Sequence, residues 1–382
     1  MTTPPTEPDL SIVVPTYREA LNLPFLLEGI RDALAGAGIA YEVIVVDDDS
    51  PDDTAAVCAK LTAAGHPLRL IVRTGERGLS SAVLRGFAAA AGRCLACMDA
   101  DLSHPPQTLV PLHRAVADGI ADVAIGSRYV AGGGTDATWG LFRWLNSRVA
   151  TLLAAPLIPA LKDPMAGYFV VRRDVLARCD ELNPVGYKIL LEILCKSRAT
   201  RVVEVPISFR DRVRGESKLS FAEQLRYLRH LGRLYRYRYP GLVQFGRFAL
   251  VGGSGMAVDL GVVHLVHYIL RQPFAVQRVA GIGAALVWNF LGNRRWTFAD
   301  ARQESAWGQF MKFVAACSLG ACVNWGVSLA CFHGVWPFTG RVLRSALAGV
   351  LAGTAFNFIL CRWWAFRQAT TGGTRPGRGA DG

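Results

Sequence analysis

Four long apolar stretches in the second half of this 382-residue chain restrict its fold more than any other feature of the sequence. Each is close to the roughly 20 residues that an α-helix needs to cross the hydrocarbon core of a bilayer. Buried helices of a soluble protein are the alternative, but four stretches of this length in succession favour a transmembrane domain. The stretches are Phe248–Leu270, Pro273–Gly292, Phe313–Phe332 and Val342–Cys361.

The apolar half contains an internal repeat. Gln244-Phe245 precedes the first pair of stretches as Gln309-Phe310 precedes the second, and Asn289–Phe298 recurs as Asn357–Phe366, so we expect two related helical hairpins. Lys and Arg are concentrated before the first span, after the second and after the fourth. The positive-inside rule then places both chain ends in the cytoplasm. The first residues lack the apolar core of a signal peptide, which agrees with a cytoplasmic first half.

The composition agrees with a membrane protein and excludes a disordered or fibrous chain. Hydrophobic residues make up 51% of the sequence and charged residues 19%, whereas a typical soluble protein has about 25% charged residues. The net charge of +12 is compatible with nucleic acid, anionic lipid or a phosphorylated substrate. The nine Cys are scattered, and Cys94 and Cys97 have no second pair with which to form a metal site, so we expect reduced thiols.

Residues 10 to about 210 alternate between short β-branched runs and Ala/Leu-rich segments with helical spacing. This alternation predicts a parallel sheet covered by helices, in which ligands bind beyond the carboxyl ends of the strands. Polar residues gather at these ends, in residues 17–19, 47–50 and 99–104, and therefore predict one active site. The predicted strands are Ser11–Val14, Val43–Val46, Leu68–Val72, Cys94–Met98 and Asp122–Ile125.

The segment Phe221–Tyr239 joins the two halves and contains five Arg and four Tyr among four Leu. A basic, aromatic amphipathic helix beside a membrane domain is typical of an element that is attracted to anionic lipid. A nucleic-acid-binding patch has a similar composition, but the membrane spans that follow favour the lipid surface. We therefore expect no nucleic-acid partner.

The sequence Asp99-Ala100-Asp101 follows an apolar strand. Two carboxylates one residue apart suit a hard divalent cation whose remaining positions are filled by phosphate oxygens. No His or Cys cluster competes with them, so the expected metal is Mg²⁺ or Mn²⁺, which would neutralise a diphosphate leaving group.

Three adjacent acids follow the second predicted strand, at Asp47-Asp48-Asp49. They repel one another unless they are solvated or bind something, and a carboxylate here can accept hydrogen bonds from a ribose or a base. The other interpretation is a helix N-cap at Ser50 or Asp53. We expect both, with Asp49 and Ser50 capping and Asp48 binding.

Seven motifs occur in an order that resembles the dolichyl-phosphate (polyprenyl-phosphate) mannose synthases, which are family-2 glycosyltransferases. The resemblance covers about residues 10–220, and the membrane half, with its motif at 289–298, resembles the GtrA-type four-helix domain that is fused to some of these enzymes. It implies an α/β, Rossmann-like GT-A catalytic domain, then amphipathic interface helices and four transmembrane helices. The motifs are Pro15–Glu19, Val46–Pro51, Asp99–Pro106, Gly126–Tyr129, Asp163–Phe169, Gly186–Glu192 and Gly215–Leu219.

The expected domain boundaries follow from this resemblance and from the apolar pattern. Residues 10–220 would form the GT-A domain, residues 221–240 the interface helix, and residues 241–368 the GtrA-like domain. Residues 1–9 and 369–382 are expected to be disordered.

The resemblance also implies roles for individual residues. The metal would be held by Asp99, Asp101 and Ser103, and the acceptor phosphate by Arg128, Arg143 and Ser147. The catalytic residues would be Asp101, Arg128, Asp163 and Arg212. The donor nucleotide would be bound by Pro15, Tyr17, Glu19, Val46, Asp48, Asp99, Ala100, Asp101, Lys188, Arg212 and Lys218. Two residues depart from the family pattern: Arg18 stands where the family has Asn, and Ser103, where it has Gln, shortens one contact to the donor or the metal.

A polyprenyl phosphate acceptor is already anionic at neutral pH, so it does not require a strong general base. The site needs positive charge and a geometry for in-line attack, and Arg side chains suit phosphate oxygens. We therefore expect Asp163 to orient the acceptor or the cationic cluster, with a role as base as the alternative. The apolar segment Trp139–Pro159 either admits the lipid tail or is an ordinary buried helix.

Polar residues inside the predicted spans are costly in lipid and should face other helices. They are Asp259, Asn289, Asn324 and Asn357. Because they occur at repeat-related positions, we expect them to form hydrogen bonds between helices, with a path for lipid headgroups as the alternative.

The sequence predicts a multi-pass cell-membrane glycosyltransferase with its catalytic domain in the cytoplasm. The resemblance implies that it transfers mannose from GDP-mannose to a dolichyl or undecaprenyl phosphate, with inversion, using Mg²⁺ or Mn²⁺. Transfer from UDP-glucose is the nearest alternative. A processive polysaccharide synthase would need a Gln/Arg-rich, Trp-containing acceptor motif after Asp101, and none is evident; a lipid translocase or anchor would not need both acids of the Asp99-Ala100-Asp101 motif.

Overall fold

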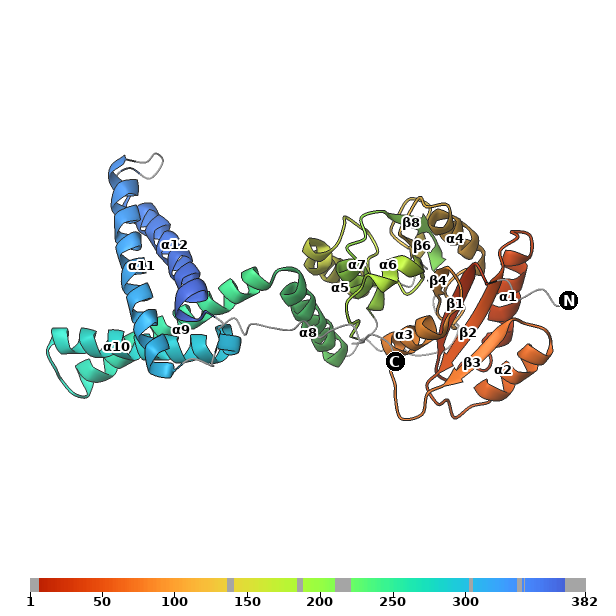
Figure 1. Ribbon diagram of the computed structural model, residues 1–382, viewed down its shortest axis with the longest axis horizontal. Helices are drawn as coiled ribbons and strands as arrows, with labels where there is room; N and C mark the ends of the chain where they lie inside the picture. Colours follow the sequence, from red (N-terminus) through yellow and green to blue (C-terminus); the bar gives the residue numbers. More distant parts are fainter. Residues whose placement is uncertain are drawn as a thin grey trace, which may run out of the picture. The chain divides into compact units, whose positions relative to one another are not determined.

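The computed structural model describes residues 7–135, 141–183, 188–209, 221–301, 305–334, 339 and 341–367. The chain forms two compact units that meet in sequence at residues 238 and 239 (Figure 1). The predicted disordered tail at 369–382 lies outside the described residues, as do residues 1–6 of the predicted disordered N-terminus. Asp9 is already part of the fold, because its backbone N–H donates to the carbonyl of Ala40 at 2.8 Å.

A seven-stranded sheet forms the centre of the first unit, in the order β3-β2-β1-β4-β7-β5-β8. The five predicted strands all form, as β1 to β5. The prediction of a parallel sheet is wrong at β7, which runs antiparallel to both β4 and β5. A strand that is buried on both faces has the same apolar pattern in either direction, so the sequence carries no signal for this reversal. The strands are β1 (Leu10–Thr16), β2 (Tyr41–Asp47), β3 (Leu68–Val72), β4 (Cys94–Cys97), β5 (Val123–Ser127), β7 (Phe169–Arg172) and β8 (Val202–Pro206).

Successive residues of each strand enter cores on opposite faces of the sheet, as the two-residue period of a strand requires. In β1, Ile12 packs with α1, α2 and α4, and Val13 packs with α3, α6 and α7. Helices therefore cover both faces (Figure 1). A two-stranded pairing of β6 (Gly134–Thr135) with β9 (Ser208–Phe209) lies apart from the main sheet. The helices are α1 (Leu23–Ala35), α2 (Thr54–Ala63), α3 (Leu79–Ala89), α4 (Leu109–Ala117), α6 (Arg173–Ala177) and α7 (Ile189–Ser197).

The predicted amphipathic segment forms α8 (Phe221–Arg238), which belongs to the first unit. Two of its tyrosines anchor it to the end of α5 (Leu141–Ala154): the hydroxyls of Tyr227 and Tyr235 donate to the carbonyls of Ala150 and Leu153, at 2.6 and 2.9 Å. Both helices also expose leucines. The exposed leucines are Leu145, Leu152 and Leu153 on α5, and Leu225 and Leu228 on α8.

The second unit contains four helices that are long and apolar enough to cross a membrane, as predicted. The two hairpins also repeat in structure, because α10 and α12 each continue into a five-residue π-helix, η3 (Asn293–Thr297) and η5 (Cys361–Ala365). The repeat-related Phe298 and Phe366 follow these π-helices and stack on each other at 4.7 Å. The helices are α9 (Pro240–Tyr268), α10 (Phe274–Gly292), α11 (Ala306–Gly334) and α12 (Val342–Leu360).

Each hairpin closes around an asparagine that faces a glycine. A Cβ at Gly255 of α9 would overlap Asn289 of α10, and a Cβ at Gly320 of α11 would overlap Asn357 of α12. The prediction of hydrogen bonds between helices is wrong for these two side-chain oxygens, which are buried without a hydrogen-bond partner among the described residues. Close approach to glycine, which small residues permit in membrane helices, takes the place of the hydrogen bond.

The other two polar residues of the spans have partners. Asp259 pairs with Arg278 on the neighbouring helix at 3.2 Å, and this contact joins α9 to α10. The side-chain oxygen of Asn324 accepts from Ser328 one turn along the same helix at 3.3 Å, which does not agree with the prediction of an interhelical bond.

Candidate active site

The three polar loops predicted to form one site follow β1, β2 and β4. These strands are parallel neighbours, with Thr16 opposite Asp47 and Val13 opposite Cys97. The carboxyl ends of parallel strands lie at the same edge of a sheet, where α/β folds bind their ligands. The structure therefore brings the loops after Thr16, Asp47 and Cys97 to one edge.

The loop after β2 holds its acidic residues through local hydrogen bonds. The carboxylate of Asp47 accepts from the Thr16 hydroxyl at 2.9 Å, from the Ser50 hydroxyl at 2.6 Å and from the Ser50 backbone N–H at 2.8 Å. The Ser50 hydroxyl oxygen in turn accepts the backbone N–H of Arg18 at 2.8 Å. Charge-assisted hydrogen bonds of this kind compensate for the crowding of carboxylates.

The predicted capping role is wrong for this loop. Asp53 occupies the N-cap position of α2, but its side chain makes no cap hydrogen bond. Asp52 accepts the backbone N–H of Thr54 instead, at 3.2 Å. Ser50 bonds to Asp47 and Arg18, and Asp49 has a φ of 55°, in the left-handed region.

Asp48 pairs with a residue outside the predicted site. Arg73, at the end of β3, donates from Nε to Asp48 Oδ1 at 2.8 Å and also from Nη2, and the backbone N–H of Gly78 donates to Oδ2 at 2.8 Å. The side chains of Arg73 and Asp48 are only 4% and 11% exposed. Asp48 therefore fixes the 73–78 loop, and its binding of a nucleoside stays a prediction.

Tyr17 lies beside two guanidinium groups. The ring is 38% exposed, and its centroid is 5.2 Å from Cζ of Arg18 and 4.9 Å from Cζ of Arg77. The motifs predict no role for Arg77, because residues 73–78 match none of them, and they include Arg18 only as a departure from the family pattern. An exposed aromatic ring with adjacent guanidinium groups can contact both a nucleobase and an anion. The predicted neighbour Glu19 accepts from Asn22 at 2.6 Å, and Pro15 is half-buried at the end of β1.

The Asp99-Ala100-Asp101 loop after β4 is a tight turn. Asp99 and Asp101 are both half-buried, and Leu102 has a φ of 62°. Ser103, the third predicted metal ligand, is buried and donates its hydroxyl to Asp101 Oδ1 at 2.5 Å. The Ser103 hydroxyl therefore points at Asp101, which is itself a predicted metal ligand.

His104 also contacts this loop through a hydrogen bond. Its Nδ1 accepts the backbone N–H of Asp99 at 3.1 Å, and its ring stacks on Tyr168 with centroids 4.9 Å apart. Burial lowers the pKa of His104 below its ordinary value, against the opposite effect of the Asp99 and Asp101 carboxylates. The Tyr168 hydroxyl donates to the carbonyl of Pro105 at 3.0 Å. The motif around Asp99 and the motif around Tyr168 are thus packed together.

Arg128 and Asp163 form a two-pronged ion pair, which agrees with the expectation that Asp163 orients a cationic group. Arg128 donates from Nε at 2.8 Å and from Nη2 at 2.9 Å to the two carboxylate oxygens of Asp163. Burial opposes the charge of Arg128, but the hydrogen bonds to Asp163 outweigh it and raise the pKa of the guanidinium. The backbone N–H of Asp163 donates to Glu204 at 2.8 Å, which links the pair to β8.

The remaining predicted residues are distributed unevenly. Val46 is buried in β2 and Ala100 is buried in the loop after β4, so any contact with a donor would come from their backbones. Lys188 is half-buried at the start of α7. Arg212 and Lys218 lie outside the described residues, and so do the side chains of Arg143 and Ser147 in α5.

The residues present fit a metal that is shared with a substrate. Among the described residues, no three His, Cys, Asp or Glu side chains are grouped so that they could hold an ion by themselves. Mg²⁺ is usually held by one or two carboxylates, with phosphates and waters completing its octahedron. Asp99 and Asp101 supply such carboxylates. A Cβ at Gly167 would lie 3.2 Å from Asp99 Oδ2, so the glycine leaves room beside this oxygen.

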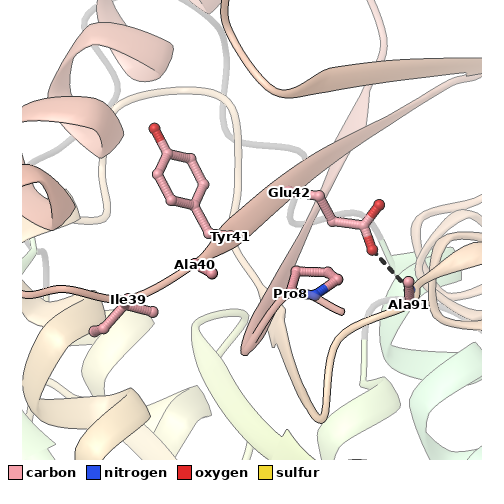
Figure 2. A pocket seen from close by; sticks show the side chains of 6 residues that line it. All are labelled: Pro8, Ile39, Ala40, Tyr41, Glu42 and Ala91. Atoms are coloured by element: carbon pink, nitrogen blue, oxygen red, sulfur yellow. Dashed lines mark hydrogen bonds between the residues drawn. The ribbon is translucent and has the colours of Figure 1, made fainter. Parts of the chain in front are cut away.

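A shallow hollow lies away from this edge, at the amino ends of the strands. It is lined by residues that precede or begin β1, β2 and β4 (Figure 2). Glu42, which lies in it, accepts the backbone N–H of Ala91 at 2.7 Å and the hydroxyl of Ser11 at 2.6 Å, so this carboxylate has partners within the fold. The predicted residues do not line this hollow. Its lining is Pro8, Ile39, Ala40, Tyr41, Glu42 and Ala91.

Comparison with known proteins identifies relatives of both units. Residues 11–179 match the family Glycosyl transferase family 2, and residues 247–372 match the GtrA/DPMS transmembrane domain. The dolichol-phosphate mannosyltransferase of Pyrococcus furiosus is 39% identical over 357 residues, which cover 92% of this chain and 98% of the relative. The dolichol-phosphate mannosyltransferase of Saccharomyces cerevisiae is 41% identical over 60% of this chain and 88% of its own length. Among solved structures, mannosyl-3-phosphoglycerate synthase from Rubrobacter xylanophilus is 20% identical over 60% of this chain and 75% of its own, with a TM-score of 0.48.

Proposed function

Because the chain belongs to the dolichol-phosphate mannosyltransferases, with a GT-A glycosyltransferase domain and a GtrA/DPMS transmembrane domain, we propose that it transfers mannose from GDP-mannose to a polyprenyl phosphate. The transfer takes place at the cytoplasmic face of the membrane and inverts the anomeric carbon. A phosphate oxygen of the acceptor forms the new bond to that carbon, and the bond to the β-phosphate of GDP breaks.

One observation carries the proposal. The Pyrococcus furiosus relative aligns with 98% of its length, across the sheet domain and all four apolar helices. Here both units match the relative, which supports the pairing of a nucleotide-sugar donor with a membrane lipid.

The acceptor phosphate binds at Arg128. Desolvated guanidinium groups favour phosphate oxygens, and the pairing with Asp163 fixes the plane of the Arg128 fork before the acceptor arrives. Asp163 is only 2% exposed and already accepts three hydrogen bonds from Arg128, one of them from its backbone N–H. These contacts favour a positioning role over that of a general base.

The donor binds along the edge formed by the loops after β1, β2 and β4. Tyr17, Arg18 and Arg77 contact its nucleoside, and Asp99 and Asp101 hold a divalent cation, Mg²⁺ or Mn²⁺, with its diphosphate. When bound, such an ion neutralises the charge that develops on the leaving diphosphate. Arg212, Lys188 and Lys218 remain proposed contacts to the same phosphates.

The exposed leucines of α5 and α8 support a membrane-facing surface on the catalytic unit. Leu152 is 73% exposed and Leu228 is 52% exposed. Apolar side chains at this exposure on an amphipathic, Arg-rich helix are typical of elements that lie in the headgroup region. The lipid tail of the acceptor then lies against α5 and α8 while its phosphate reaches Arg128.

The experiment is a transfer assay with the purified full-length chain in detergent. A short polyprenyl phosphate is supplied with radiolabelled GDP-mannose or UDP-glucose, and the lipid product is extracted. Label from GDP-mannose should enter lipid, and Asp101→Ala should abolish this transfer while the protein remains folded. Lipid labelled only from UDP-glucose, or transfer that persists in Asp101→Ala, would contradict the proposal.

A further inference from the structure

The loop between β4 and the short helix η1 (Pro106–Thr108) fixes its two carboxylates with its own side chains. Ser103 donates its hydroxyl at 2.5 Å and its backbone N–H at 3.1 Å to the same oxygen, Oδ1 of Asp101. His104 receives the backbone N–H of Asp99 on Nδ1 at 3.1 Å. Leu102 lies between them with a φ of 62°, a conformation that non-glycine residues rarely adopt. These hydrogen bonds hold the turn in one form.

We propose that Ser103 and His104 are positioning residues that preset the carboxylates of Asp101 and Asp99 for a divalent cation and the donor diphosphate. The inference rests on the proposed function, in which these two carboxylates hold the metal. Residues that hydrogen-bond to metal ligands orient them, and replacing such a residue typically lowers metal affinity by about 10–100-fold.

The contacts of Ser103 favour a role in orienting Asp101, and not a role as a metal ligand. Ser103 is 2% exposed and directs its hydroxyl hydrogen to Asp101. Both contacts go to Oδ1 of Asp101 and fix the orientation of this carboxylate. A single rotamer of Asp101 is selected before the metal arrives.

His104 acts on Asp99 in a comparable way. Because Nδ1 accepts a backbone N–H, the proton of the neutral ring lies on Nε2. This Nε2 is 3.9 Å from Asp99 Oδ2, which is too far for a hydrogen bond but close enough to attract that oxygen. The ring itself cannot rotate freely, since it stacks on Tyr168 with an interplanar angle of 19° and meets Phe209 edge-on at 5.7 Å.

Simple packing is the competing explanation for His104, and two substitutions separate it from positioning. His104→Phe keeps a ring against Tyr168 but removes the acceptor for Asp99 N–H. His104→Asn loses the stacked ring but keeps an oxygen near the place of Nδ1. Positioning predicts that His104→Asn retains more metal affinity than His104→Phe, and packing predicts the reverse order. For Ser103, Ser103→Ala removes the hydroxyl and Ser103→Thr restores it.

The experiment measures the binding of Mn²⁺ to the full-length chain in detergent at saturating GDP. Binding is monitored as the loss of the EPR signal of free Mn²⁺. Ser103→Ala and His104→Phe should weaken Mn²⁺ binding by about 10–100-fold, and Ser103→Thr and His104→Asn should recover part of the loss. His113→Phe is the matched control, because His113 is a buried histidine on α4, and it should bind Mn²⁺ like the wild type. Thermal unfolding of each variant accompanies the titration.

The outcomes separate this inference from the proposed function. Wild-type Mn²⁺ affinity in Ser103→Ala and His104→Phe would overturn the inference and leave the proposed transfer intact. Better retention in His104→Phe than in His104→Asn would also overturn it. Preserved Mn²⁺ binding with no transfer of mannose would contradict the proposed function alone. A wild-type chain that binds no Mn²⁺ with GDP would overturn both.

Discussion

Replacing Asp163 by Asn perturbs the proposed acceptor site at one atom. Oδ2 of Asp163 accepts from Arg128 Nε at 2.8 Å and from the Arg128 backbone N–H at 3.2 Å, and Oδ1 accepts from Nη2 at 2.9 Å. An amide presents an oxygen to only one of these two sides, so at least one charge-assisted bond is lost. Such a bond contributes about 1.5–3 kcal/mol. Since about 1.4 kcal/mol is a factor of ten, KM for the lipid should rise about 10–100-fold.

The assay measures initial rates against a short polyprenyl phosphate at saturating GDP-mannose, and then against GDP-mannose at saturating lipid. Asp163→Asn should raise KM for the lipid and leave KM for the donor within about twofold. Asp118→Asn, at the exposed end of α4, is the control and should change neither constant. A fall in kcat with an unchanged lipid KM would refute the positioning role and favour Asp163 as a base. No change in either constant would mean that the pair has no part in acceptor binding.

Three further predictions concern stability. Arg73→Ala removes the ion-pair partner of the buried Asp48 carboxylate, so it should destabilise the catalytic unit by about 3–5 kcal/mol and lower its Tm. An unchanged Tm would show that the Arg73–Asp48 pair does not contribute to stability. Gly255→Ala should lower the Tm of the membrane unit because its Cβ would overlap a facing asparagine, whereas Gly252→Ala, with open space, should not; equal effects would contradict the packing described here. Burial lowers the pKa values of His113 and His230 in the folded chain, so below about pH 6.5 the unfolded chain binds more protons than the folded chain. The free energy of unfolding should therefore fall as the pH drops below about 6.5. A Tm that is constant from about pH 7.5 to 5.5 would contradict this.

Features that depend on local periodicity or length could be predicted from the sequence. The strand Leu68–Val72 forms with the predicted bounds, and the segment predicted over 221–239 forms helix α8. The four membrane helices follow from the length of their apolar stretches. These elements are set by side chains within the segment itself, so a single sequence contains the necessary information.

Features that depend on distant partners could not be predicted. Asp48 is paired with Arg73, 25 residues away, and no spacing rule links the two positions. The two asparagines of the hairpins were expected to hydrogen-bond across helices, but their oxygens face Gly255 and Gly320. A sequence shows that a polar residue in a span needs a neighbour, but the register of two helices decides which neighbour it meets.

The position of the donor nucleotide tests the central claim most directly. A structure of the full-length chain with GDP and Mn²⁺, with the ion located by its anomalous scattering, would give this position. We predict the ion between the GDP diphosphate and the carboxylates of Asp99 and Asp101, at the edge where the loops after β1, β2 and β4 meet. An ion or a nucleotide bound away from Asp101, for example at the amino ends of the strands, would contradict the account.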